Sequence, residues 1–403
     1  MSTNGTTKDS IEPRSSYINE ILNKGSDFLF ENSAFLIIGT LAALIFAASD
    51  HHTYHELIHE PHGGVTFHFI VNDVLMCFFF AIAAKEIWEA MLPGGTLSSP
   101  KKAMTPIMAT VGGVAGPALL YFGLTKLFNQ PDAVRGWAIP CATDIAFSYL
   151  VARLIFGKSH PAIPFLLLLA IVDDAVGLLI LAVFYPTGSM DLATFSICLI
   201  GAVGFNLLLR KFGVKNFWFF LIFAGPLAWY GFYKGGIHPA LALVPLIPTL
   251  PHAKRDEGLF AEDHKEDALN AFEHWWKKPV ELILMMFGLA NAGVVLSSFG
   301  STTSFVTAGL LVGKPVGIFI CTWIAVHLLR LSLPEGMKMK DVFVVGCVAG
   351  IGFTVALFVS TVAFEPGALQ DAAKMGALLS FAAAILSFLS AMILKVGRYS
   401  KSA

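Results

Sequence analysis

Charged residues are scarce in this chain of 403 residues: only 14% are Asp, Glu, Lys or Arg, while 56% are hydrophobic. A soluble domain would struggle to bury so much apolar surface, and the mean hydropathy of +0.70 indicates a polytopic membrane protein. No run of Lys and Arg is long enough to indicate a nucleic-acid partner, and the net charge is −1. The lipid bilayer is therefore the partner that the composition predicts.

Signatures of several other protein classes are missing. The five cysteines lie in apolar segments and include no C-x-x-C pair, which argues against a disulfide or metal framework. No Walker A pattern, nucleotide fingerprint or Ser-His-Asp arrangement is apparent. The first thirty residues are polar and contain acids, unlike a cleavable signal. We therefore expect a protein that is not an enzyme, uses no cofactor and draws energy from an ion gradient.

Apolar stretches of membrane-spanning length dominate the chain, because crossing about 30 Å of hydrocarbon takes roughly 20 helical residues. Twelve of them lie near residues 33–49, 66–84, 103–123, 137–156, 162–185, 190–209, 216–230, 236–251, 279–298, 302–329, 342–364 and 370–394. The predicted fold class is an all-α membrane protein with about 12 transmembrane helices. We expect a cytoplasmic arm at 1–32, one transporter domain at 33–396 and a tail at 397–403.

The distribution of basic residues predicts the orientation. With the amino terminus in the cytoplasm, the cytoplasmic segments hold 22 of the 27 Lys and Arg residues, and the opposite side holds four. Cytoplasmic loops are enriched in Lys and Arg, so this asymmetry supports both the helix count and the orientation. Both termini are therefore predicted to be cytoplasmic.

Four charges fall inside the predicted spans. Asp173 and Asp174 are adjacent in the otherwise uncharged run 161–184, Asp144 lies in the fourth span and Lys314 in the tenth. Each charge at the centre of a bilayer costs roughly 3 kcal/mol or more on insertion scales, so such residues usually mark a functional site. Three acids and one base at matching depth indicate a pathway for a cation or a proton.

Helix-breaking residues interrupt two spans near their middles. The fourth contains Pro140-Cys141-Ala142-Thr143-Asp144, and the eleventh contains Gly350-Ile351-Gly352. Either the small residues serve close helix packing, or the unwound backbone lines a watery cavity. The broken spans hold corresponding places in two helix triplets, at about 103–185 and 302–394, of opposite orientation. This pattern indicates an inverted-repeat transporter with its site at the repeat interface. There, Asp144 would offset facing helix N-termini and Lys314 facing C-termini.

Five motifs together resemble the NhaA-type sodium/proton antiporters: Ala142-Thr143-Asp144-Ile145-Ala146-Phe147, Ala170-Ile171-Val172-Asp173-Asp174, Ala290-Asn291-Ala292-Gly293-Val294, Gly313-Lys314-Pro315-Val316-Gly317 and Gly350-Ile351-Gly352-Phe353-Thr354. That family is itself a known inverted-repeat fold, so the two inferences are not independent. The resemblance implies twelve helices with spans 4 and 11 crossing at mid-membrane. It also implies exchange of Na⁺, and usually Li⁺, for H⁺ across a bacterial inner membrane.

The resemblance also implies residue roles. Asp174 is the expected principal Na⁺ ligand, and Asp173 is its protonatable neighbour, able to pair with Lys314. Thr143 and Asp144 are the expected contributions of the broken helix to ion binding and charge compensation. These groups offer the oxygen ligands that a hard cation such as Na⁺ prefers. If Na⁺ and protons compete for both aspartates, the exchange is electrogenic and proceeds by alternating access.

Three other functions remain open at this stage. One is a passive cation channel, which Lys314 opposite the acids disfavours. A sodium-coupled symporter of related fold would use similar groups. An intramembrane aspartyl protease also buries two aspartates, but it needs them on separate helices, whereas here they are adjacent.

Three further features lie outside the core of the site. Glu86, Glu273 and His274 match acidic and histidine positions that the family associates with pH response, although the residues around Glu86 depart from the family pattern. The segment 50–65 is a predicted periplasmic loop, which relatives often use for dimer contact, so a homodimer is a candidate assembly. The same loop contains five histidines, His51, His52, His55, His59 and His62. These side chains either bind a metal ion such as Zn²⁺ or are simply solvated. The segment 252–278 is a predicted cytoplasmic linker with a partly helical end.

Overall fold

The computed structural model describes residues 34–61, 63–98, 100–188, 190–252, 267–295 and 298–400, and every long element in these ranges is helical. The predicted arm at 1–32, His62, most of the linker and residues 401–403 lie outside them. The first half contains α2 (Ala34–Ser49), α3 (His51–His59), α4 (Phe67–Phe69), the π-helical η1 (Ile70–Leu75), α5 (Met76–Met91), α6 (Pro100–Leu127), the 3₁₀ helix η2 (Pro131–Cys141), α7 (Ile145–Phe156) and α8 (Ala162–Phe184).

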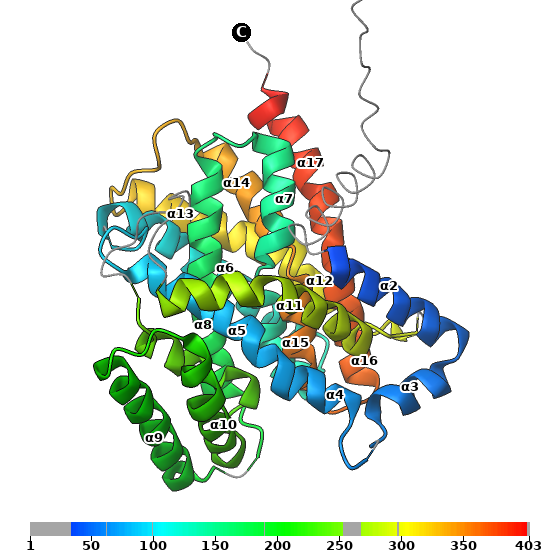
Figure 1. The fold of residues 1–403 in the computed structure, drawn as a ribbon. Helices are drawn as coiled ribbons and strands as arrows, with labels where there is room; N and C mark the ends of the chain where they lie inside the picture. The colour runs from blue at the N-terminus through cyan, green and yellow to red at the C-terminus, as the bar shows by residue number, and fades with distance from the viewer. Residues whose placement is uncertain are drawn as a thin grey trace, which may run out of the picture.

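The second half begins with α9 (Leu192–Lys211) and α10 (Phe217–Gly235), a helix pair at one edge of the molecule (Figure 1). The remaining elements are η3 (Pro239–Leu241), η4 (Val244–Thr249), α11 (Ala268–Asn291), α12 (Ser301–Ala308), the π-helical η6 (Gly309–Gly313), α13 (Lys314–His327), α14 (Met339–Ala349), α15 (Phe353–Ala363), α16 (Ala368–Leu378), η7 (Leu379–Phe381), α17 (Ala382–Leu394) and η8 (Gly397–Tyr399).

Within the described residues, six helices are long and apolar enough to cross a membrane, or up to eight if each of two bent pairs counts as one span. The bent pairs are η2 with α7, at 55°, and α14 with α15, at 51°. Both predicted helix breaks are therefore confirmed. Length and composition alone do not establish the predicted count of twelve.

Two local predictions need correction. The segment 50–65, expected as a loop, contains helix α3. The Asp50 carboxylate caps it by accepting from the backbone N–H of Thr53, and Tyr54 and Ile58, four residues apart, are buried on one face. Of the two spans expected at 216–230 and 236–251, the first is the α-helix α10, which ends where Gly236 adopts a left-handed conformation. The second is not an α-helix but contains the short 3₁₀ helices η3 and η4.

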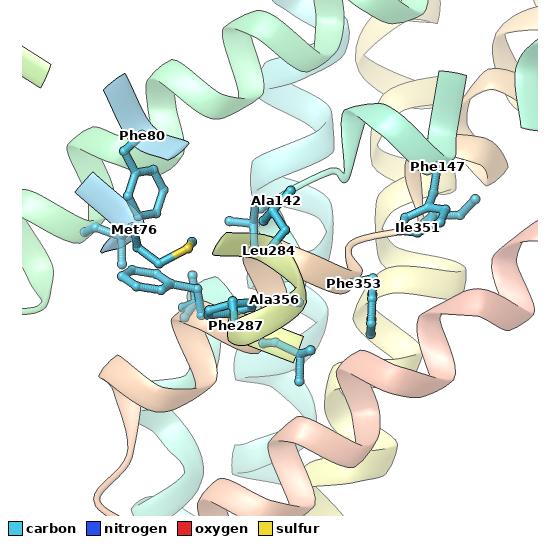
Figure 2. Packing of buried hydrophobic residues seen from close by; sticks show 14 of the residues in the cluster. Met76, Phe80, Ala142, Phe147, Leu284, Phe287, Ile351, Phe353 and Ala356 are labelled. Atoms are coloured by element: carbon cyan, nitrogen blue, oxygen red, sulfur yellow. The ribbon is translucent and has the colours of Figure 1, made fainter. Parts of the chain in front are cut away.

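Aromatic and aliphatic side chains fill the space around the two breaks. Phe147 of α7 and Phe353 of α15 flank the crossing and pack edge to face, with ring centroids 5.9 Å apart. Met76 and Phe80 of α5 lie beside Phe287 of α11 (Figure 2). This packing holds the broken elements against continuous helices on either side, which fixes the positions of the polar groups at the crossing.

Candidate functional site

The two helix breaks meet, and backbone and side-chain hydrogen bonds join them. The backbone N–H of Asp144 donates to the carbonyl oxygen of Ile351 at 2.8 Å, and the Ser148 hydroxyl donates to that of Val348 at 3.1 Å. Gly352 permits this approach, because a Cβ there would lie 2.9 Å from the carbonyl oxygen of Ala142. Backbone groups freed by the breaks thus find partners across the crossing, as hydrocarbon surroundings require.

Asp144 lies between two helix N-termini. Its carboxylate accepts from the backbone N–H of Phe147 at 3.3 Å and from that of Thr354 at 3.2 Å, and it also accepts from the Thr354 hydroxyl. Phe147 and Thr354 lie in the first turns of α7 and α15. Each helix N-terminus carries a partial positive charge, so this buried carboxylate offsets both.

Asp173 forms a buried ion pair with Lys314. Nζ of Lys314 lies 2.7 Å from Oδ2 of Asp173, and neither side chain is exposed. The same ammonium donates to the carbonyl oxygen of Cys141 at the C-terminal end of η2. The Thr143 hydroxyl lies 2.7 Å from Oδ2 of Asp173 and 3.1 Å from the carbonyl oxygen of Ala349, the end of α14. Within the described ranges, Oδ1 of Asp173 is buried without a hydrogen-bond partner, so it is free to accept a cation or a proton.

Close packing of α13 against α6 positions Lys314. A Cβ on Gly112 would lie 2.0 Å from the carbonyl oxygen of Gly317, and a Cβ on Gly317 would lie 2.1 Å from that of Gly112. Only glycine fits these two places, which is how small residues bring membrane helices together. The π-helical turn η6 ends directly before Lys314, and such turns often occur at functional sites.

Asp173 and Asp174 line two adjoining small cavities. Asp173 lines one with Cys141, and Asp174 lines the other with Phe80 of α5. Both cavities share the lining residues Ala142, Gly177, Leu181 and Val355. Asp174 is half-buried, and no hydrogen bond reaches its carboxylate from the part of the chain that the structure describes. The adjacent acids therefore differ: one is held in an ion pair, and the other is available.

The residues matched to pH response form a separate cluster. Lys85 of α5 is buried and forms ion pairs with Glu89, at 2.6 Å, and with Glu273 of α11. Glu86 and His274 are exposed neighbours of this cluster. Glu86 was the residue expected here from the sequence, whereas the ion pair that links α5 to α11 is made by Lys85.

Two contributions to the site were missed from the sequence. Thr354 donates to Asp144, and its place directly after a helix break, where hydroxyl groups often bond at helix termini, was the available signal. The carbonyl oxygen of Cys141 accepts from Lys314. No sequence signal could have identified it, because every residue carries that group.

Comparisons with known proteins support one reading of this geometry. The profile of a family described as "Na+/H+ antiporter 1" matches residues 30–394. A protein named "Na(+)/H(+) antiporter NhaA" from Jannaschia sp. (strain CCS1) is 49% identical over 412 residues, covering 92% of this chain and 98% of that protein. Proteins of the same name from Desulfitobacterium hafniense (strain DSM 10664 / DCB-2) and Geobacter sulfurreducens are 47% and 46% identical, covering 93% and 94% of this chain and 97% and 100% of theirs.

Proposed function

This chain belongs to the NhaA family of Na⁺/H⁺ antiporters, which are multi-pass bacterial membrane proteins, and we propose that Na⁺ and protons compete in it for the carboxylates of Asp173 and Asp174. The family assignment favours antiport over the sodium-coupled symporter and the aspartyl protease considered above. One observation carries the assignment of the site: two adjacent acids border the crossing of two broken helices, and a buried lysine pairs with only one of them.

Asp174 is the group where the cation enters. It lines a cavity, and its carboxylate accepts no hydrogen bond within the described ranges, so a dehydrated Na⁺ would not have to displace a protein donor. Na⁺ is a hard cation that binds oxygen ligands, and a carboxylate supplies both the oxygen atoms and the compensating charge. Protonation of Asp174 neutralises that charge and releases the ion.

Asp173 couples the ion to a second proton. Once Na⁺ lies between the two carboxylates, the free Oδ1 of Asp173 completes the ligand set of the ion. The positive charge of the bound Na⁺ then weakens the ion pair of Asp173 with Lys314. Two protons leave for each bound Na⁺, one from the Asp174 carboxyl and one from the Asp173–Lys314 pair when Na⁺ takes the place of the ammonium beside Asp173. The exchange is therefore electrogenic.

Thr143 and Asp144 hold the crossing in place in this mechanism. The Asp144 carboxylate is occupied by donors from α7 and α15, which favours charge compensation over direct coordination of Na⁺. Alternating access then follows from rocking of the crossing against the surrounding helices.

The rest of the assignment follows the family. We infer twelve spans with both termini in the cytoplasm, a bacterial inner-membrane location, Li⁺ as a second substrate and assembly as a homodimer. The inverted repeats at about 103–185 and 302–394 are supported by the reciprocal contact of Gly112 in α6 with Gly317 in α13, helices at matching places in the two repeats.

The decisive test is Asp174→Asn in proteoliposomes, with proton movement followed after addition of Na⁺. The amide keeps one oxygen but loses the charge, so coupled exchange should disappear while the protein stays folded. Asp191→Asn is the matched control, because Asp191 is an exposed cap of α9 and asparagine caps helices equally well. Substantial exchange by Asp174→Asn at equal protein level would refute the site.

A further inference from the structure

A row of histidines runs along α3. His51, His55 and His59 are spaced four residues apart, which places them on one face of the helix. Ring centroids lie 6.4 Å apart for His51 and His55 and 4.7 Å apart for His55 and His59. The first two side chains are exposed, whereas His59 is half-buried. The transport mechanism uses none of these residues.

The spacing of the two exposed rings suits a shared metal ion. Imidazole nitrogens bind Zn²⁺ at about 2.0–2.1 Å, and two rings on one tetrahedral ion have centroids about 5–6 Å apart. The separation of 6.4 Å between His51 and His55 is close to this range, and small side-chain rotations would close the gap. We propose that His51 and His55 chelate one divalent ion of borderline softness, such as Zn²⁺ or Ni²⁺, on the surface of α3.

The helix backbone is already fixed in the position that such a site needs. The Tyr54 hydroxyl donates to the carbonyl oxygen of Leu289 at 2.8 Å and accepts from the backbone N–H of Gly293 at 3.2 Å. Ile58 is fully buried on the same face. Binding would therefore order only two side chains, which keeps its entropic cost low.

Neighbouring groups limit the site to two protein ligands. His59 packs against His68, with ring centroids 5.1 Å apart. No three His, Cys, Asp or Glu side chains within the described ranges are arranged to hold a metal ion. Water would fill the remaining positions, as in open metal sites.

Calorimetric titration of the detergent-purified protein with ZnCl₂ and with NiCl₂ tests the proposal, using a purification tag without histidine. His51→Gln and His55→Gln should each raise the dissociation constant about tenfold or more, because each removes the chelate, while His52→Gln should change it less than about twofold. His52 is the matched control: it is exposed on the same helix, off the row, 3.3 Å from Glu56. Ca²⁺, added as CaCl₂, is a hard cation that prefers oxygen ligands, so it should not bind to the two histidines.

Three results would overturn the proposal: no binding to the parent protein, equal binding by the parent and His55→Gln, or an equal loss in His52→Gln. Melting curves should be unchanged in all three variants, because these side chains are exposed. Asp174→Asn should bind the metal like the parent protein, so failure of the metal site and failure of the transport site can be distinguished.

Discussion

Removal of the Lys314 ammonium is predicted to lower stability and transport together. Nζ of Lys314 contacts Oδ2 of Asp173 and the carbonyl oxygen of Cys141, and both side chains of the ion pair are fully buried. Deleting one partner of a buried pair leaves an uncompensated charge, which typically costs about 3–5 kcal/mol. Lys314→Ala should therefore destabilise the protein by a loss of this size.

Size-matched variants separate charge from packing. Lys314→Met keeps most of the volume and loses the ammonium, so it should lose nearly as much stability as Lys314→Ala. Lys314→Arg keeps the charge with a different geometry and should recover much of the stability but less of the transport. The double variant Lys314→Met with Asp173→Asn removes both charges and should be more stable than Lys314→Met alone.

The assay is thermal melting in detergent, paired with Na⁺-driven proton movement measured on the same preparations. A Lys314→Met variant that melts like the parent protein would refute the reasoning, because the buried carboxylate would then have no need of the ammonium. The same result would remove the ion pair with Asp173 from the proposed mechanism.

Three further predictions concern stoichiometry and the crossing. Transport should generate a current on a supported membrane and respond to an imposed potential; exchange that is indifferent to voltage would contradict a ratio of two protons per Na⁺. Gly352→Ala should reduce stability and transport, because its Cβ would lie 2.9 Å from the carbonyl oxygen of Ala142. The control Gly204→Ala in α9, with open space around it, should be tolerated. Equal behaviour of the two variants in melting and transport assays would count against the crossing. Thr354→Val removes a hydroxyl donor from the Asp144 carboxylate and should cost about 1.5–3 kcal/mol of stability by melting, and an unchanged melting curve would show that this bond is dispensable.

The sequence by itself determined the features that depend on local chemistry. Apolar length and the scarcity of charge established the membrane class, and Pro140, Gly350 and Gly352 located both helix breaks, because backbone preference and hydrocarbon compatibility are properties of a short segment. The buried charges Asp173 and Lys314 were visible for the same reason, since each is expensive in an apolar run.

Only the tertiary structure decided which groups meet. Asp144 bonds to Thr354, 210 positions away, because the helix crossing and the face that each side chain presents come from packing between distant helices. The pairing of Lys314 with Asp173 was implied by the family resemblance, and the structure shows that Lys314 does not pair with the adjacent Asp174. Within the segment 50–65, helix α3 likewise lies where the Tyr54 hydroxyl can reach the end of α11. A helical period shows that a residue is buried, but the partner it is buried against depends on how the helices pack around it.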